Sequence, residues 1–280
     1  MTLPHIHNEW QSSQTIKLTN HGVYMRKILA FLFTSIALCF SGPTMATGET
    51  ILIYSYHNHP PFVTGSYTGL TYDLADALNK QAAGRYNFQV SIVPRSRLNY
   101  YLKNWIDGKC PNDVCEQNWI VPWVNPNWGF IRGDRDNYLW HPLFTDSNVI
   151  VSLVTDSFIY NNPESLKGRV LAGMRGHRYV GIDELVTSGD ITRIDGNRER
   201  DNIMKVLVNR VTATLLPNST MQYLLENDKE IKAKAEQLKL GDEKHQIYVR
   251  HLMLPETRTD LMQLIENIPV QQLVNIKLNN

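Results

Sequence analysis

Apolar residues follow two alternating patterns along the chain, and these patterns predict strands and helices in turn. Short, nearly continuous apolar runs at 51–56, 118–124 and 148–155 predict buried β-strands. Between such runs, apolar residues spaced three to four apart predict amphipathic helices, as over 70–82, where Thr71 is placed to act as the N-cap. Because strands that alternate with helices favour parallel sheets with helices on both faces, we expect an α/β protein.

The same alternation continues to the end of the chain. Further strands are predicted at 87–94, 169–174, 191–195, 211–217 and 247–254, and further helices at 97–105, 177–188, 201–209, 219–226, 228–240 and 257–268. The charged helix 228–240 is expected to end at Gly241, since glycine readily adopts the left-handed C-cap conformation. In open α/β sheets ligands bind at the carboxyl ends of strands, so residues that follow strands are the first candidates for a site.

Composition excludes some classes of partner. The chain has 280 residues, of which 42% are hydrophobic and 20% charged, and both values are ordinary for a soluble globular protein of one or two domains. The formal net charge is +1 and no block of lysine or arginine stands out. We therefore expect no nucleic-acid partner.

The N-terminal region has the pattern of an export signal. A basic stretch at 25–27 precedes an apolar run at 28–40, and small residues follow at 44–46. This order predicts a secretory signal peptide over 25–46 and a periplasmic mature protein, with 1–24 as a non-native extension before an initiator Met25. A buried helix or an uncleaved anchor is the alternative interpretation of the apolar run.

Two cysteines remain once the predicted signal is removed. Cys110 and Cys115 lie five positions apart in a polar stretch. An even number of cysteines in an exported chain favours a disulfide between them. Because the loop closed by this bridge is short, we expect it to rigidify a surface loop rather than to stabilise the whole fold.

Several segments resemble a known family in their order and spacing. They are Tyr54–Leu78, with a Pro-Phe turn and a Gly-Leu helix start, followed by Pro94–Leu102, Trp140–Leu143, Ser165–Val170 and Asp201–Val211. Together they are similar to the extracellular solute-binding proteins of family 3, which include periplasmic polar amino-acid-binding proteins. The resemblance implies a type II, two-lobed α/β fold with two crossover strands and a ligand cleft between the lobes. It implies lobe 1 at 47–145 and 246–280, and lobe 2 at 146–245.

The resemblance also implies a function. Such proteins capture a small polar solute, here an amino acid or a similar molecule, and deliver it by hinge closure to an ABC importer permease in the inner membrane. We expect a monomer that is not an enzyme and needs no metal or cofactor. Two alternatives stay open: a dehydratase-like enzyme on the same scaffold, with His177 and either Asp201 or Glu199 as acid and base, and an orphan sensory binding module.

Lobe 2 supplies the first candidate ligand-binding residues. Gly176, His177 and Arg178 follow a predicted strand and open a predicted helix, so their amides and the helix dipole favour an anion. The matching family loop holds the ligand carboxylate, although His177 stands where relatives have a hydroxyl residue. A plain strand-to-helix turn is the alternative. Asp201 matches the family carboxylate for the ligand α-amino group, and an N-cap is its alternative role.

Lobe 1 supplies the remaining candidates. An arginine is expected to bind the ligand carboxylate through its planar fork of donors. Arg135 is the preferred residue, with Arg132 and Arg97 as alternatives. Tyr56 and Phe62 are the aromatic residues predicted to contact the solute side chain.

Two further features bear on the ligand. His57 and His59 would share a face of an extended segment and could begin a metal site, but a role in a binding loop or at the surface is the favoured interpretation. Thr212 stands where the relatives carry an aspartate. Because of such departures the solute need not be a standard amino acid.

Overall fold

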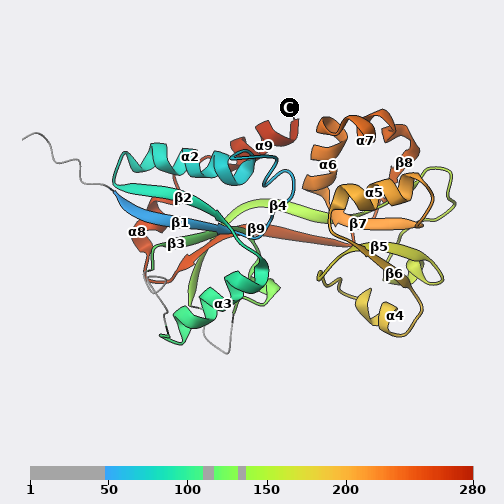
Figure 1. Ribbon diagram of the computed structural model, residues 1–280, viewed down its shortest axis with the longest axis horizontal. Coiled ribbons are helices and arrows are strands. Elements are labelled where there is room, and N and C mark those ends of the chain that lie inside the picture. The colour runs from blue at the N-terminus through green and yellow to red at the C-terminus, as the bar shows by residue number, and fades with distance from the viewer. Residues whose placement is uncertain (1–47, 110–116, 132–136, 280) are drawn as a thin grey trace, which may run out of the picture. The chain divides into compact units, whose positions relative to one another are not determined.

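A computed structural model describes residues 48–109, 117–131 and 137–279 of the chain (Figure 1). The predicted extension, the predicted signal peptide and the predicted disulfide between Cys110 and Cys115 lie outside these residues. Within the described ranges, no helix combines the length and the apolar character needed to cross a membrane.

Strands and helices alternate along the described chain, as the sequence pattern predicts. The strands are β1 Glu49–Ser55, β2 Tyr86–Ile92, β3 Trp119–Val124, β4 Tyr138–Leu153, β5 Val170–Met174, β6 Thr192–Gly196, β7 Ala213–Pro217, β8 Leu238–Leu240 and β9 Gln246–Pro255. The α-helices are α2 Leu70–Ala82, α3 Arg95–Ile106, α4 Asp183–Thr187, α5 Glu199–Leu207, α6 Asn218–Asn227, α7 Lys229–Ala233, α8 Thr259–Ile265 and α9 Val270–Asn279. Short 3₁₀ turns are η1 Pro126–Trp128, η2 Pro163–Leu166 and η3 Ala235–Gln237.

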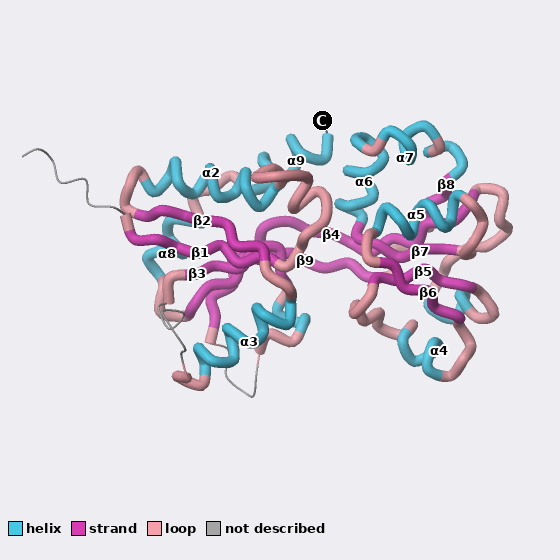
Figure 2. Tube along the Cα trace, in the orientation of Figure 1, coloured by secondary structure: helices cyan, strands magenta, loops and turns pink. Residues whose placement is uncertain are grey.

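The strands form a mixed sheet rather than the parallel sheets that the alternation predicts. Its order is β2-β1-β3-β9-β4-β7-β5-β6, with β8 also paired to β4. β1 pairs in parallel with β2 and β3, and β5 pairs in parallel with β6 and β7. Between these groups β4 and β9 run antiparallel to each other, from Tyr138 opposite Pro255 to Asn148 opposite Gln246 (Figures 1 and 2). These two strands connect the parallel groups.

Buried apolar side chains gather in clusters at either end of the β4–β9 pair. Two clusters draw on β1, α2, β3, α8 and the adjoining ends of β4 and β9. Two others draw on the far end of β4 together with β5, α5, β7 and α6. Each end of the sheet therefore has its own hydrophobic core, while the residue boundaries between the lobes stay a prediction.

The start of α2 differs from the sequence prediction, because Thr71 does not cap it. The residue before the helix is Gly69, with φ of 117°, and no side chain caps this end. Instead the amides of Leu70 and Thr71 donate to the carbonyls of Pro61 and Phe62, at 2.9 and 3.0 Å. The Thr71 hydroxyl is buried, and it accepts a hydrogen bond from the Trp123 indole. Backbone carbonyls of the preceding loop thus accept the hydrogen bonds that a capping side chain would otherwise accept from the first amides of the helix.

The predicted charged helix at 228–240 is wrong. Helix α7 ends at Ala233, a 3₁₀ turn follows, and Leu238–Leu240 forms strand β8 against β4. Leu238 is buried in the same core as Ile231, and strand pairing gives its backbone partners that a longer helix on the surface would not supply. The predicted helix at 177–188 is likewise shorter, since α4 begins only at Asp183. The last predicted helix, at 257–268, corresponds to α8, and the sequence pattern did not predict α9.

One ion pair is buried where β4 and β9 run side by side, and we call it the hinge pair. Arg250 Nε donates to Asp146 Oδ2 at 2.8 Å, and the two side chains are only 1% and 2% exposed. Arg250 also donates to the Trp123 carbonyl and to the Tyr248 hydroxyl. Asp146 accepts from both the amide and the hydroxyl of Ser219 at the start of α6. The hinge pair therefore ties β3, β4, β9 and α6 together.

Candidate functional site

Histidines occupy the loop between β1 and α2. His57 is only 7% exposed, and its Nε2 atom has no hydrogen-bond partner among the described residues. Its ring lies over Phe62, with centroids 5.2 Å apart. His59 Nδ1 lies 3.0 Å from the Pro60 carbonyl oxygen, which can only accept, so Nδ1 carries a proton and donates.

A carboxylate faces this loop from the start of α5. Glu199 is only 4% exposed, its Oε1 atom lies 3.8 Å from His59 Nδ1, and within the described chain Oε1 accepts no hydrogen bond. A buried carboxylate without partners is unfavourable by several kcal/mol, roughly, even after the protein relaxes around it. Such a group is the kind that a ligand satisfies.

Together, His57, His59, His177 and Glu199 form what we call the His–Glu cluster. The rings of His57 and His59 have centroids 5.6 Å apart. Burial, followed by the nearby charges of Arg250, His59, His177 and Arg95, holds the pKa of His57 well below its usual value. Desolvation lowers the pKa of His177, while the charge of Glu199 acts in the opposite direction. The cluster therefore combines one carboxylate with three imidazoles, and the neutral form is favoured for those of His57 and His177.

In the described parts of the chain, no group of three His, Cys, Asp or Glu side chains is arranged to hold a metal ion. The role of His57 and His59 in a loop beside the site is the interpretation that the geometry favours.

The predicted glycine loop lies between β5 and α4. Gly176 has φ of 77°, in the left-handed region that suits glycine. Arg193 donates to the carbonyls of Met174 and His177, at 2.8 and 3.0 Å, and so fixes both ends of the turn. The amides of Gly176 and Arg178 donate to no acceptor among the described residues. The loop offers amides, but not a helix dipole, because α4 starts at Asp183.

Asp201 is not the carboxylate that faces the cluster. Both of its oxygens accept from Arg198, at 2.9 and 3.0 Å, in a largely exposed pair. It does not cap α5 either, because the helix begins at Glu199 and its N-cap is Arg198. With 3.6 residues per turn, residues two apart point in nearly opposite directions, so Glu199 is buried and Asp201 faces outward. The ligand-binding role predicted for Asp201 stays a prediction, and on the same helix turn it is Glu199 whose side chain is buried.

The predicted aromatic contacts have other partners. The Tyr56 hydroxyl accepts from Arg95 Nη1 at 3.1 Å, and the Arg95 guanidinium also stacks on Phe130, with Cζ 3.9 Å from the ring centroid. Phe62 is completely buried beneath Arg250, whose Cζ lies 4.6 Å from the ring centroid. The Tyr56 hydroxyl is therefore already hydrogen-bonded to Arg95, and the Phe62 ring packs against His57 and His59 of the loop.

The arginine predicted to bind the ligand carboxylate from lobe 1 has one candidate, Arg97, among the described residues. Arg135 and Arg132 lie outside the described residues, so their roles stay predictions. Arg97 is exposed in the first turn of α3. Sequence reasoning did not single out Arg95, which precedes Arg97 by two positions and lies against Tyr56.

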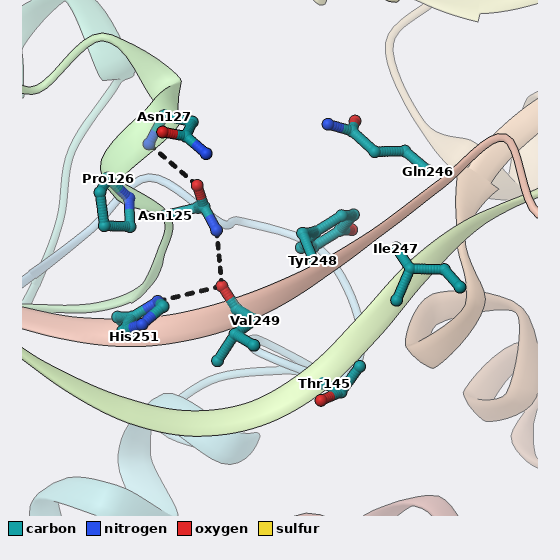
Figure 3. Close-up of a pocket in the computed structure, with 9 residues that line it drawn as sticks. All are labelled: Asn125, Pro126, Asn127, Thr145, Gln246, Ile247, Tyr248, Val249 and His251. Atoms are coloured by element: carbon teal, nitrogen blue, oxygen red, sulfur yellow. Dashed lines mark hydrogen bonds between the residues drawn. The ribbon is translucent and has the colours of Figure 1, made fainter.

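A cavity of about 420 Å³ lies along β9, and we call it the hinge cavity (Figure 3). Its lining residues come from η1 and the residue before it, and from β4 and β9: Asn125, Pro126, Asn127, Thr145, Gln246, Ile247, Tyr248, Val249 and His251. Asn125 and His251 both donate to the Val249 carbonyl, and the side chains of Asn127 and Gln246 also line the cavity (Figure 3).

The hinge cavity and the His–Glu cluster are neighbours across Trp128. The Trp128 ring centroid lies 5.2 Å from that of Tyr248, in the cavity wall, and 6.1 Å from that of His57. No member of the His–Glu cluster lines the cavity. The hinge cavity and the His–Glu cluster are therefore separate polar regions beside the β4–β9 pair, and the Trp128 ring lies between them.

Comparisons with known proteins identify the fold. No family model matches the chain, and no curated protein matches it. Among solved structures, a mutant of ArgBP from T. maritima covers 82% of this chain and 96% of its own at 16% identity, with a TM-score of 0.55. The GluR0 ligand-binding core from Nostoc punctiforme covers 82% and 100% at 14% identity, with a TM-score of 0.56.

A third structure extends this agreement. An arginine transport system periplasmic binding protein from Legionella pneumophila covers 82% of this chain and 96% of its own, at 15% identity and a TM-score of 0.54. The chain has the two-lobed, type II periplasmic-binding-protein fold. In this fold β4 and β9 are the crossover strands that the resemblance implied, and the His–Glu cluster joins the β1–α2 loop to the start of α5.

Proposed function

We propose that this protein is a periplasmic solute-binding protein that captures a small polar solute, an amino acid or a similar molecule, for an ABC importer. The solute bridges lobe 1, at 47–145 and 246–280, and lobe 2, at 146–245, and stabilises the closed arrangement. Closure of this kind requires a solute with higher affinity for the closed form than for the open one.

The observation that carries the proposal is the unpaired, buried carboxylate of Glu199 near the glycine loop. Its Oε1 atom accepts no hydrogen bond from the described protein, so a cationic group of a solute gives it a favourable partner. The open amides of Gly176 and Arg178 offer donors to an anionic group. A molecule with an ammonium and a carboxylate a few bonds apart fits both requirements.

The compared structures support the same class of solute. A further similar structure, a Gly52Ala mutant of ArgBP from T. maritima at 16% identity and a TM-score of 0.52, is bound to arginine, and the GluR0 core is bound to L-glutamate. Both ligands carry an ammonium and a carboxylate on one carbon. Because these proteins share only 14 to 16% identity with this chain, we carry over the solute class and not the particular amino acid.

The rest of the assignment follows from the binding role. We infer export through a cleaved signal peptide at 25–46, action as a monomer, and docking of the closed form on the permease of the importer. None of the three compared structures is named as an enzyme, and we assign no catalytic residue. Ligand binding remains assigned to Gly176, His177 and Arg178, with Arg135 proposed for lobe 1 and Glu199 in place of Asp201.

A thermal-shift screen tests the proposal. The protein purified from the periplasm is heated with each of a panel of L-amino acids, amines and organic acids at millimolar concentration. A ligand present at about 100 times its Kd stabilises the folded state by about 2.7 kcal/mol, which is a clear shift in Tm. The account predicts a shift with at least one amino acid. No shift from any zwitterion, with a shift from organic acids alone, would contradict it.

A further inference from the structure

His57 carries a second buried polar atom that the described protein leaves unpaired. The residue is only 7% exposed, and its Nε2 atom has no hydrogen-bond partner among the described residues. Its backbone amide donates to the Ser55 hydroxyl at 3.2 Å, which fixes the residue just after β1. A histidine that only fills a core generally has its ring nitrogens satisfied by protein groups, so the His57 nitrogen is available to a ligand.

Aromatic rings surround the His57 imidazole. The ring centroids of Tyr56, Phe62 and Trp128 lie 4.2, 5.2 and 6.1 Å from that of His57. In such weakly polar surroundings a charged group requires a countercharge, whereas a neutral polar group requires only a hydrogen bond. The unpaired ring nitrogen can supply that hydrogen bond.

Two guanidinium groups act on the His57 ring. Burial is the largest cause that holds the pKa of His57 well below its usual value, and the positive charges of Arg250 and Arg95 act in the same direction. Arg250 is paired with Asp146. Among the described residues, Arg95 donates to a side-chain carboxamide, a phenol and a backbone carbonyl, none of which carries a negative charge. The charge beside His57 therefore disfavours a cationic group of a solute.

The neutral imidazole of His57 also limits which groups it can bind. One nitrogen of a neutral imidazole donates and the other accepts, and the tautomer decides which is which. A carboxamide or a hydroxyl both donates and accepts, so it matches Nε2 in either tautomer. An ammonium or a guanidinium only donates, and a carboxylate only accepts and needs several donors when it is buried.

We propose that His57 determines the specificity for the solute side chain, and that this side chain ends in an uncharged hydrogen-bonding group, a carboxamide or a hydroxyl. The inference rests on the proposed function and deepens it, because it concerns the end of the solute that lies away from its ammonium and carboxylate groups. Amino acids with cationic side chains, such as arginine and lysine, are then poor ligands, and so are those with acidic side chains.

Calorimetry on the wild-type protein at pH 7.5 gives the first test and needs no variant. The uncharged polar probes are L-glutamine, L-asparagine and L-serine, and the probes compared with them are L-glutamate, L-aspartate, L-methionine and L-arginine. Each amide has nearly the same shape as its acid, so that pair differs in charge alone. We expect one uncharged polar probe to bind at least tenfold more tightly than every charged or apolar one. A charged probe or L-methionine that binds as tightly would overturn the inference.

His57→Phe gives the second test, because it keeps a ring against Phe62 and Trp128 but removes the ring nitrogens. We expect the Kd of the tightest uncharged polar probe to rise about fivefold, the effect of one lost neutral hydrogen bond, and that of L-methionine to change less than twofold. His141→Phe is the matched control, since it changes a histidine of β4 outside the His–Glu cluster, and it should leave both Kd values within twofold of wild type. An unchanged preference for the polar probe in His57→Phe would overturn the role of His57.

The proposed function and the specificity inferred for His57 fail in different ways. If no amino acid binds to the wild-type protein, the proposed function fails and the specificity fails with it. If L-arginine binds most tightly and His57→Phe does not change its Kd, the proposed function stands, while selection of an uncharged side chain is overturned.

Discussion

Two buried carboxylates in this protein have opposite surroundings. Asp146 of the hinge pair accepts hydrogen bonds from Arg250 and twice from Ser219. Glu199 is as deeply buried, yet its Oε1 atom has no partner in the described chain. A fully satisfied charge holds the crossover strands to their neighbours, whereas an unsatisfied one stores a preference for a ligand. This difference is the reason we propose Glu199, and not Asp146, as a ligand-binding residue.

The hinge pair should give the largest loss of stability. Arg250→Met leaves Asp146 buried without its cation, and breaking one partner of a buried pair costs about 3–5 kcal/mol. Urea denaturation of the variant and of the matched control Arg198→Met, which removes an exposed arginine, measures this loss. A loss of unfolding free energy below about 1 kcal/mol, similar to that of the control, would show that the hinge pair does not stabilise the fold more than an exposed ion pair does.

Gly69 should give the next largest effect, because it shapes the loop that carries His57 and His59. A Cβ atom at this position would lie 2.6 Å from the Phe62 carbonyl oxygen, on a backbone with φ of 117°. We expect Gly69→Ala to lower the free energy of unfolding by about 2–3 kcal/mol. Gly84→Ala is the control, since its φ is 87° but a Cβ there meets no atom within 4 Å. Equal losses in the two variants would mean that the contact with Phe62 is not decisive.

Glu199→Gln should behave in the opposite way to the hinge variant. Removal of a buried charge that lacks protein partners leaves the free energy of unfolding unchanged at pH 7.5 or raises it by about 1 kcal/mol. Chemical denaturation without solute measures the change. Destabilisation as large as that of Arg250→Met would place Glu199 with the structural charges, contrary to the comparison.

Asp201→Asn should give the smallest effect. Its ion pair with Arg198 is largely exposed, and such pairs contribute about 0.2–1 kcal/mol. A loss within about 0.5 kcal/mol, which shrinks further in 0.5 M salt, is expected from denaturation curves at low and high ionic strength. A larger, salt-independent loss would point to a buried role for Asp201.

Much of the fold could be predicted from the sequence, because period and burial are local signals. The runs at 51–56 and 118–124 became β1 and β3, and the apolar spacing over 70–82 became α2. The antiparallel crossing of β4 and β9 could not be read from the alternation, since that pairing joins segments about a hundred residues apart. Helix 228–240 failed for a related reason: pairing of Leu238 with β4 overrode its local helical character.

The site was only partly predictable. The turn at Gly176 and the first turn of α5 were found at the carboxyl ends of strands, where the topology predicts a site. Which carboxylate is buried depends on where α5 begins: the sequence pattern began this helix at Asp201, whereas it begins at Glu199, and Glu199 is the buried one. The position of Glu199, directly after β6 and a turn, marked it in the sequence as a possible site residue. Only the structure shows that its side chain is buried whereas that of Asp201 is not.

The most direct test of the account is the solute affinity of Glu199→Gln against that of Asp201→Asn. Both variants replace one carboxylate with its amide on the same helix turn, and calorimetry with the amino acid found in the thermal-shift screen measures Kd at pH 7.5. Loss of a charged hydrogen bond of about 1.5–3 kcal/mol predicts a Kd raised about 10- to 100-fold in Glu199→Gln. Asp201→Asn should stay within about twofold of wild type, which corresponds to about 0.4 kcal/mol. The reverse order, or an unchanged Kd in Glu199→Gln, would contradict the account.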